Sequence, residues 1–405
     1  MTVKSVTMIS WDLDPFYTRG GTAYAIRRLA DQLTELGIKT RVLLPDQSVR
    51  DGIDRAPRVI QCSEFCRTAL ETVEQITASD AIIAHSDEGA MFTILRNGQR
   101  HAEPSVFWLH SLYDPPLNDF SEDQRRLLPS QSLLASAVMM ADIVVTSAGI
   151  LQDAREFEWP DRLKELQQAL TNASAERRVL TVESMGCLPK NSPQGLAQSS
   201  SLENLPSPYV LFPGRPSIDK GFGIYAAIAE RLRADNIACV AVQRPAQRAN
   251  PENPSRNAPI YWLPWLAQDE LRVAMHNAAC TVLPSITEGF GLAAAESINQ
   301  GVTTLYHEVG GHHSLHGLPN ALAVPLTPSE RARLYELWAE LIDTHPDSWA
   351  VWTRHEASLR PLVNKWIEAI RSVVYRSDGP GIGFSEPPVE ERWGNKLRDR
   401  IESYV

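Results

Sequence analysis

The sequence has no apolar run that approaches the roughly 18 residues needed to cross a bilayer as a helix. Its first segment, MTVKSVTMIS, is too short and too polar for a signal peptide. The formal net charge is −10, and an acidic surface disfavours nucleic acids and anionic membranes as principal partners. These absences predict a cytoplasmic protein with no nucleic-acid partner and no integral membrane contact. We expect a monomer or homodimer.

Cysteines are few, and none has the CxxC spacing of a metal or redox motif. Their number is odd, and most lie in apolar or strand-like segments, so we expect buried free thiols in a reducing compartment. The five are Cys62, Cys66, Cys187, Cys239 and Cys280.

The 405 residues exceed one ordinary core, which predicts two domains. Short apolar segments alternate with helical patterns in both halves, as in parallel α/β sheets. Between them, residues 188–208 are rich in Pro, Ser, Gln and Asn and show no periodicity, which is typical of a linker. We therefore expect an N-terminal domain at 1–187, this linker, and a C-terminal domain at 209–375. Residues 376–405 should form a loop and a final helix that packs back on the N-terminal domain.

Strands are predicted wherever a short apolar segment is bounded by Gly, Pro or polar residues. In the first half they cover 3–10, 39–44, 81–84, 105–109, 143–146 and 177–183. In the second half they cover 209–212, 237–242, 260–263, 280–283, 303–306 and 322–324. The helices with the clearest patterns cover 23–36, 221–234, 268–277, 292–299, 329–344 and 348–374.

Residues 282–303 carry two glutamates, Glu288 and Glu296, with Gly289 and Gly291 between them. Pro284 ends a strand here, and an Ala-rich helix begins at Leu292. A strand, a glycine-containing turn and a helix start bring backbone N–H groups together, which favours binding of an anion. The alternative is two exposed carboxylates on an ordinary Ala-rich helix.

Arg215 and Lys220 follow the end of the 209–212 strand. An arginine fork and a lysine point charge on one loop suit a diphosphate. A surface arginine and a helix-start lysine in a solvated loop are the alternative.

These motifs resemble the retaining GT-B glycosyltransferases of family 4, also called glycosyl transferases group 1. Three C-terminal segments carry the resemblance: FPGRPSIDKG, the E-x7-E stretch and VGGHHSLHGLPNALAVP. Gly20-Gly21 and the WLH sequence ending at His110 support it more weakly. The resemblance implies two Rossmann-like domains that face a central cleft, with the nucleotide sugar on the C-terminal domain and the acceptor on the N-terminal one.

The resemblance also implies residue roles. Arg215 and Lys220 would bind the diphosphate, Glu288 the transferred sugar, and Glu296 the ribose hydroxyls. His110 would contact the transferred sugar, although a structural histidine is the alternative; His85, at another strand end, is interpreted as structural. The remaining predicted donor-site residues contribute backbone N–H groups or line the site, and the alternative for Gly20-Gly21 is a plain turn. They are Gly20, Gly21, Gly289, Phe290, Gly291, Leu292, Gly310 and Gly311.

Two sequences suggest a metal but fit one poorly. Asp12-Leu13-Asp14 lies in the first loop, where an acceptor-side lining is the better interpretation. His312-His313-x2-His316 lacks the i, i+4 helical spacing and a completing Cys or Asp. We expect no metal and no cofactor besides the nucleotide-sugar donor as co-substrate.

The resemblance therefore implies a retaining transferase that moves a hexose-like sugar from a UDP- or GDP-sugar to a small acceptor. Met185-Gly186-Cys187-Leu188 replaces the Asn-Gly-Val-Asp-like turn of the family, and the first loop, WDLDPFYTRGG, is aromatic and acidic. Both departures favour an unusual polar or cationic acceptor, such as a natural-product aglycone. The alternatives are a GT-B sugar-nucleotide epimerase or hydrolase and a non-catalytic sugar-nucleotide-binding subunit.

Overall fold

The computed structural model describes twelve stretches of the chain. They are residues 2–9, 21–43, 79–98, 103–113, 126, 128–182, 202, 204–242, 258–264, 266–344, 348–375 and 393–404. The chain divides into two compact units. The first contains Met1–Glu183 and Glu391–Val405, and the second contains Ser184–Glu390.

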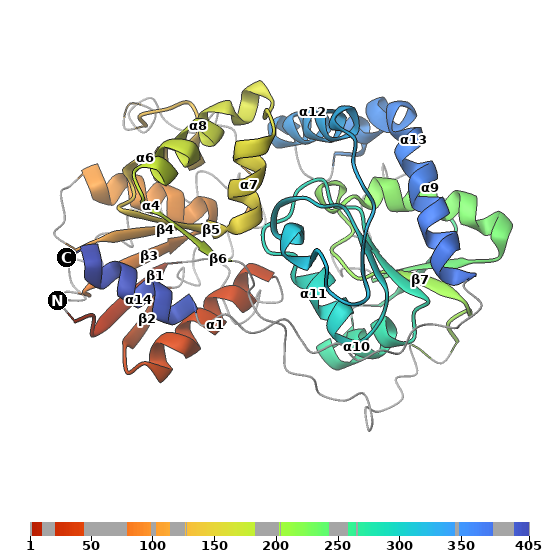
Figure 1. The fold of residues 1–405 in the computed structure, drawn as a ribbon, viewed down its shortest axis with the longest axis horizontal. Helices are drawn as coiled ribbons and strands as arrows, with labels where there is room; N and C mark the ends of the chain where they lie inside the picture. Colours follow the sequence, from red (N-terminus) through yellow and green to blue (C-terminus); the bar gives the residue numbers. More distant parts are fainter. Residues whose placement is uncertain are drawn as a thin grey trace. The chain divides into compact units, whose positions relative to one another are not determined.

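The first unit is built on a parallel six-stranded sheet in the order β2-β1-β3-β4-β5-β6 (Figure 1). Its strands are β1 (Ser5–Ile9), β2 (Lys39–Leu43), β3 (Ala81–His85), β4 (Ser105–Leu109), β5 (Ile143–Ser147) and β6 (Val179–Val182). Its helices are α1 (Gly21–Glu35), α4 (Ser86–Gly98), α6 (Leu133–Met140), α7 (Ala148–Glu156), α8 (Asp161–Ala175) and α14 (Trp393–Tyr404). Strands β3, β4 and β5 are buried along their whole length, as expected of the centre of a parallel sheet covered on both faces.

The second unit has its own parallel six-stranded sheet, in the order β12-β11-β10-β7-β8-β9. Its strands are β7 (Tyr209–Phe212), β8 (Ala238–Val242), β9 (Ile260–Leu263), β10 (Cys280–Leu283), β11 (Thr304–Tyr306) and β12 (Ala321–Ala323). Its helices are α9 (Phe222–Leu232), α10 (Gln268–His276), α11 (Leu292–Asn299), α12 (Pro328–Thr344) and α13 (Trp349–Val374). Short 3-10 segments among the described residues include η3 (Ile218–Lys220), η4 (Arg233–Asp235) and η7 (Gly310–Leu315). Two Rossmann-like parallel sheets confirm the predicted α/β fold class.

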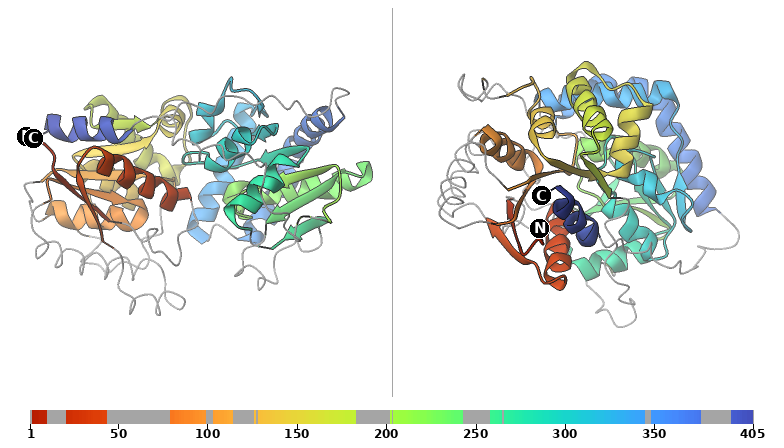
Figure 2. Two further views of the ribbon diagram at one scale, coloured as in Figure 1. Left: turned by 90° about the horizontal axis from the view of Figure 1, so that it is seen from below. Right: turned by 60° about the vertical axis from the view of Figure 1, so that its left-hand side comes forward.

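Helix α14 belongs to the first unit although it lies at the other end of the chain. Figures 1 and 2 show it beside α1, and the two helices are in contact. The backbone N–H of Gly394 donates to the side-chain oxygen of Gln32 at 2.8 Å, where a Cβ on Gly394 would lie 2.9 Å from Gln32 Cβ. A glycine at this position therefore lets the last helix approach α1 closely.

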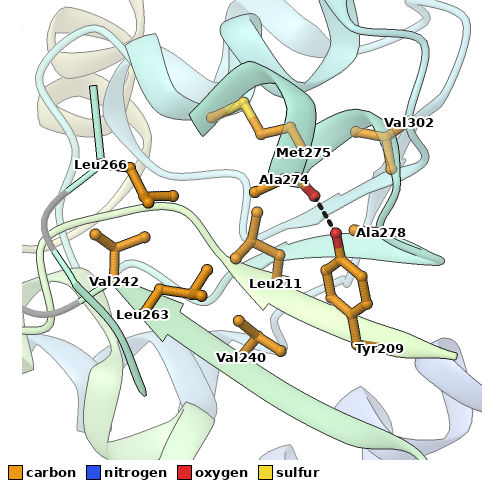
Figure 3. Packing of buried hydrophobic residues seen from close by; sticks show 10 residues of the cluster. All are labelled: Tyr209, Leu211, Val240, Val242, Leu263, Leu266, Ala274, Met275, Ala278 and Val302. Atoms are coloured by element: carbon orange, nitrogen blue, oxygen red, sulfur yellow. Dashed lines mark hydrogen bonds between the residues drawn. The ribbon is translucent and has the colours of Figure 1, made fainter. Parts of the chain in front are cut away.

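One hydrophobic cluster of the second unit lies between its sheet and helix α10 (Figure 3). Apolar side chains from β7, β8 and β9 meet Ala274 and Met275 of this helix. The hydroxyl of Tyr209 donates to the carbonyl oxygen of Ala274 at 2.6 Å, so the one polar atom of this buried ring has a partner (Figure 3). This packing fixes β7, which leads into the Arg215–Lys220 loop.

Two further predictions meet the structure in part. Cys239 and Cys280 are buried free thiols, as expected, whereas Cys62, Cys66 and Cys187 lie outside the described residues. Within the described ranges, no helix is long and apolar enough to cross a membrane.

Candidate functional site

The candidate site forms where β7 and β10, neighbouring strands of the second sheet, reach their carboxyl ends. Lys220 follows β7 at the end of η3, and Glu288 follows β10 in the turn before α11. The Nζ of Lys220 lies 3.1 Å from Oε1 of Glu288 and 3.5 Å from the carbonyl oxygen of Thr287. Two residues that are 68 positions apart thus form a direct, half-buried ion pair.

Glu288 is charged at neutral pH despite its burial. Burial alone raises its pKa, but the charge and hydrogen bond of Lys220, together with the charge of His312 when that ring is protonated, outweigh burial, so the pKa of this carboxyl is lowered. The hydroxyl of Ser285 also donates to Oε2 at 3.3 Å. The site therefore holds a carboxylate, the form that accepts hydrogen bonds from sugar hydroxyls.

Arg215 lies on the same loop as Lys220 and is held by its neighbours. Its Nη2 donates to Oδ2 of Asp219 at 2.9 Å, and its Nε donates to the hydroxyl of Ser217 at 3.0 Å. Asp219 is buried, and its backbone carbonyl accepts from Ile286, which follows β10. The Arg215 side chain is 39% exposed. Its guanidinium is therefore oriented by Asp219 and Ser217 and is still accessible to solvent.

The predicted glycines bring a second loop onto Glu288. Gly310-Gly311 begin η7 after β11, and the N–H of Gly311 donates to the carbonyl oxygen of Glu288 at 3.1 Å. Gly310 has φ +48°, and a Cβ there would collide with that same carbonyl oxygen. Only glycine permits this approach, which joins the E-x7-E turn to the glycine-rich turn.

The other predicted residues of this turn line it at different depths. Gly289 is buried, and Phe290 and Leu292 are half-buried. Gly291 has φ +67° and precedes α11, where a Cβ would lie 2.6 Å from Cδ2 of His312. The space beside Glu288 is therefore filled by an imidazole ring.

Glu296 extends from the middle of α11 and is half-buried. Burial raises its pKa to about 7, against smaller lowering effects of a hydrogen bond from Gln268 and the charge of Arg272. Its surroundings are thus residues of α10, and no contact to Lys220 or Glu288 is recorded among the described residues. A carboxyl with this pKa binds or releases a proton near neutrality.

His110 lies in the first unit, directly after β4. Its Nε2 lies 2.9 Å from Nδ1 of His85, the last residue of β3, and both rings are buried and stack against Trp108. Burial lowers the pKa of His110 to about 3 and that of His85 well below its usual range. The two histidines form a neutral pair in which one proton lies between them.

Several predictions fall on residues that the structure does not describe. Gly20, Asp12, Asp14 and the turn at 185–188 lie outside the described residues, and Gly21 is the first residue of α1. Across the described ranges, no group of three or more His, Cys, Asp or Glu side chains could hold a metal ion. His312 is buried, whereas the side chain of His316 is 77% exposed, so these two do not share a site.

Sequence reasoning missed the residues that support Glu288 and Arg215. Asp219 and Ser217 orient the arginine, and Ser285 donates to Glu288. His307 was not considered, and His312 was considered only as a metal ligand. The Asp directly before Lys220 was a readable signal, since a carboxylate four positions after an arginine can pair with it.

Two family models match parts of this chain. Residues 196–317 match the family described as "Glycosyl transferases group 1", and residues 5–147 match "Starch synthase catalytic domain". A comparison with curated protein sequences gave no match.

Solved structures share the fold at low sequence identity. The catalytic domain of starch synthase IV from Arabidopsis thaliana, bound to ADP and acarbose, has a TM-score of 0.58 and 14% identity over 93% of this chain and 100% of that chain. Sucrose-phosphate synthase from Thermosynechococcus elongatus has a TM-score of 0.57 and 16% identity, covering 89% and 99%. The UDP-forming α,α-trehalose-phosphate synthase from Burkholderia vietnamiensis has a TM-score of 0.55 and 14% identity, covering 92% and 99%.

The group 1 match spans Arg215, Lys220, Glu288, Glu296 and Gly310-Gly311, so it contains the whole candidate site of the second unit. The starch synthase match covers most of the first sheet, with His85 at the end of β3 and His110 directly after β4. The chain therefore has the GT-B fold of these structures, and its residues 196–317 match the glycosyl transferases group 1.

Proposed function

We propose that the protein transfers a sugar from a nucleoside-diphosphate sugar to a small polar acceptor, with retention of the anomeric configuration. The observation that carries this proposal is the Lys220–Glu288 ion pair at 3.1 Å, next to the hydrogen bond from Gly311 N–H to the backbone carbonyl of Glu288. The pair supports the proposal because a cation suited to a leaving diphosphate lies beside a carboxylate suited to sugar hydroxyls.

The chemistry follows from charge development. When the bond between sugar and diphosphate breaks, negative charge grows on the phosphate oxygens and positive charge on the anomeric carbon. Lys220 and Arg215 stabilise the leaving diphosphate, and the carboxylate of Glu288 holds the sugar and balances the positive carbon. No metal takes part in this scheme. Glu296 accepts hydrogen bonds from the ribose hydroxyls, and His110 contacts the transferred sugar.

Retention and a small acceptor rest on the sequence. The resemblance is to retaining enzymes, and a same-face substitution in which the leaving phosphate helps to take the acceptor proton is what that resemblance implies. The aromatic and acidic segment 11–21 supports a polar or cationic acceptor. UDP and GDP are the proposed donor nucleotides, and ADP, which is bound in the starch synthase structure, completes the panel.

The test incubates the purified chain with UDP-, GDP- and ADP-sugars and a panel of small acceptors. We expect one donor to be consumed only with acceptor present, and NMR of the product to show the donor's anomeric configuration. Lys220→Ala and Glu288→Ala should each lower transfer by about 100-fold or more, in line with the removal of one transition-state contact. Transfer near the wild-type rate in both variants would refute the site, an inverted product would refute retention, and release of free sugar alone would favour a hydrolase.

A further inference from the structure

His312 is a fully buried histidine that faces Glu288. Its Nδ1 lies 3.0 Å from the carbonyl oxygen of His307, and a carbonyl can only accept, so Nδ1 carries the ring proton. In the neutral ring Nε2 is then an acceptor. This Nε2 lies 3.9 Å from Oε2 of Glu288 and has no hydrogen-bond partner among the described residues. Two acceptors thus face each other in a buried place, which costs free energy unless a proton joins them.

The ring is held in this orientation from several sides. The Nδ1–H of His307 donates to the carbonyl of Ser285 at 3.1 Å, and its Nε2 accepts from Nε1–H of Trp366 at 2.8 Å. His307 is therefore a neutral, fully bonded support, and burial lowers its pKa to about 3. Gly291, which has no Cβ, leaves the space that the ring of His312 occupies. The Nε2 of His312 consequently cannot turn to another partner without breaking these contacts.

The charges around His312 and Glu288 decide whether these two side chains share a proton. Burial lowers the pKa of His312 most, Glu288 raises it, and Lys220 and His313 lower it. Asp219, also close to Glu288, acts on the carboxylate. Lys220 is thus both the present partner of Glu288 and a charge that opposes protonation of His312.

We propose that His312 is a positioning residue for Glu288: when a diphosphate draws Lys220 away from the carboxylate, His312 takes up a proton and holds Glu288 through Nε2–H. This inference rests on the diphosphate site of the proposed function. The proton comes from solvent and forms an N–H bond at Nε2, and no other covalent bond changes. The Glu288–His312 pair becomes neutral, so the diphosphate does not meet an unpaired buried carboxylate. Closing from 3.9 Å to a hydrogen bond requires a movement of about 1 Å.

The test is the number of protons taken up when a nucleotide binds. UDP, GDP and ADP are titrated by calorimetry in two buffers of different ionisation enthalpy, from about pH 8 to about pH 6. The comparison is between the wild type and His312→Gln, because glutamine keeps a neutral N–H near Nε2 but cannot take up a proton. We expect the wild type to take up more protons per bound nucleotide, with a difference that approaches one as the pH falls.

The design separates this uptake from other titrations. Titration of Glu296 and of the nucleotide itself contributes equally to both proteins and cancels in the difference. His316→Gln is the matched control, because it makes the same change in the same segment at an exposed side chain paired with Glu308. It should keep the wild-type uptake. Glu288→Gln removes the acceptor of Nε2–H and should lose the uptake as His312→Gln does, which keeps the test decisive if one variant does not fold.

The outcomes are distinct. Equal proton uptake in the wild type and in whichever of His312→Gln and Glu288→Gln folds would overturn the role of His312. It would leave the diphosphate site standing. Failure of the three nucleotides and of inorganic pyrophosphate to bind the wild type would overturn the proposed function and this inference together.

Discussion

Replacing Lys220 by methionine tests the central ion pair. Methionine keeps much of the lysine stem but leaves Glu288, whose side chain is 14% exposed, without its cation. At 3.1 Å and an effective dielectric constant of about 20, the gross attraction is about 5 kcal/mol. Breaking a fully buried pair costs about 3–5 kcal/mol. Because the Lys220 side chain is 26% exposed, we expect a loss of about 2–3 kcal/mol.

The loss should depend on pH in a stated direction. The lowered pKa of Glu288 means that its stabilising contribution is present above the usual carboxyl pKa and is lost as pH falls through the lowered value. Without Lys220, the largest effect that lowers the pKa of Glu288 is gone, and Lys220 no longer opposes protonation of His312. The Glu288–His312 pair of the variant then takes up a proton on mild acidification, so the variant's deficit against the wild type should shrink from about pH 7.5 to about pH 5.

The assay is thermal unfolding of the wild type, Lys220→Met, Glu288→Gln and the double variant. For a unit of this size the single lysine change should lower the melting temperature by about 4–12 °C. The double variant should recover most of this, because it leaves no unpaired charge. Arg354→Met is the control, since Arg354 pairs with Glu340 at 2.7 Å on the surface and should cost under about 1 kcal/mol. A Lys220→Met loss no larger than this control, or one that grows toward pH 5, would refute the reasoning.

Three further predictions concern other parts of the two units. Gly310→Ala should lower the free energy of unfolding, measured in denaturant, by at least about 2 kcal/mol more than Gly317→Ala does. Both glycines have positive φ, but only a Cβ at Gly310 would collide with backbone atoms. Equal losses would contradict this. Glu296→Gln should weaken nucleotide binding about 10-fold by calorimetry and leave binding of pyrophosphate, which has no ribose, unchanged. The difference between wild type and variant should shrink below about pH 7, as the carboxyl gains a proton. The lowered pKa values of His85 and His110 mean that below about pH 6.5 the unfolded state binds more protons than the folded state. The melting temperature of the first unit should therefore fall as the pH is lowered, and it should fall less steeply in the variant with both histidines changed to Gln. An unchanged slope in that variant would be evidence against this.

The strands of the second unit could be predicted closely because each is a short apolar run with a clear end. The bounds of β7, β9, β10 and α11 match their predictions, since proline, glycine or polar residues bound each one. Helices α4, α7 and α8 were not predicted. Helix α7 is fixed by its neighbours, with the hydroxyl of Ser147 capping the N–H of Ile150, and it directly follows β5 without a loop. Because no loop separates the strand from the helix, the sequence pattern does not mark where the helix begins.

The candidate site could be predicted only where its residues follow the strands. Lys220 and Glu288 lie in the loops that follow β7 and β10, so parallel-sheet topology brings them to one edge. The supports of Glu288 could not be found this way. His307 and Trp366 are 59 positions apart, and their hydrogen bond depends on how α13 packs on the sheet. Nor does a histidine motif show which ring nitrogen will face a carboxylate, because this depends on the backbone carbonyl that the other nitrogen meets.

The two cations of the candidate site should respond differently to a diphosphate. Arg215 has a planar fork of five N–H donors, and those that bind Asp219 and Ser217 need not be released when others bind phosphate. Lys220 is a point charge that already lies on Glu288, so binding phosphate requires it to leave. Proton uptake should therefore follow Glu288 and not Asp219. Asp219→Asn is expected to change nucleotide affinity through Arg215 while calorimetry still finds the wild-type proton uptake, and loss of that uptake in Asp219→Asn would show that the proton does not belong to the Glu288–His312 pair.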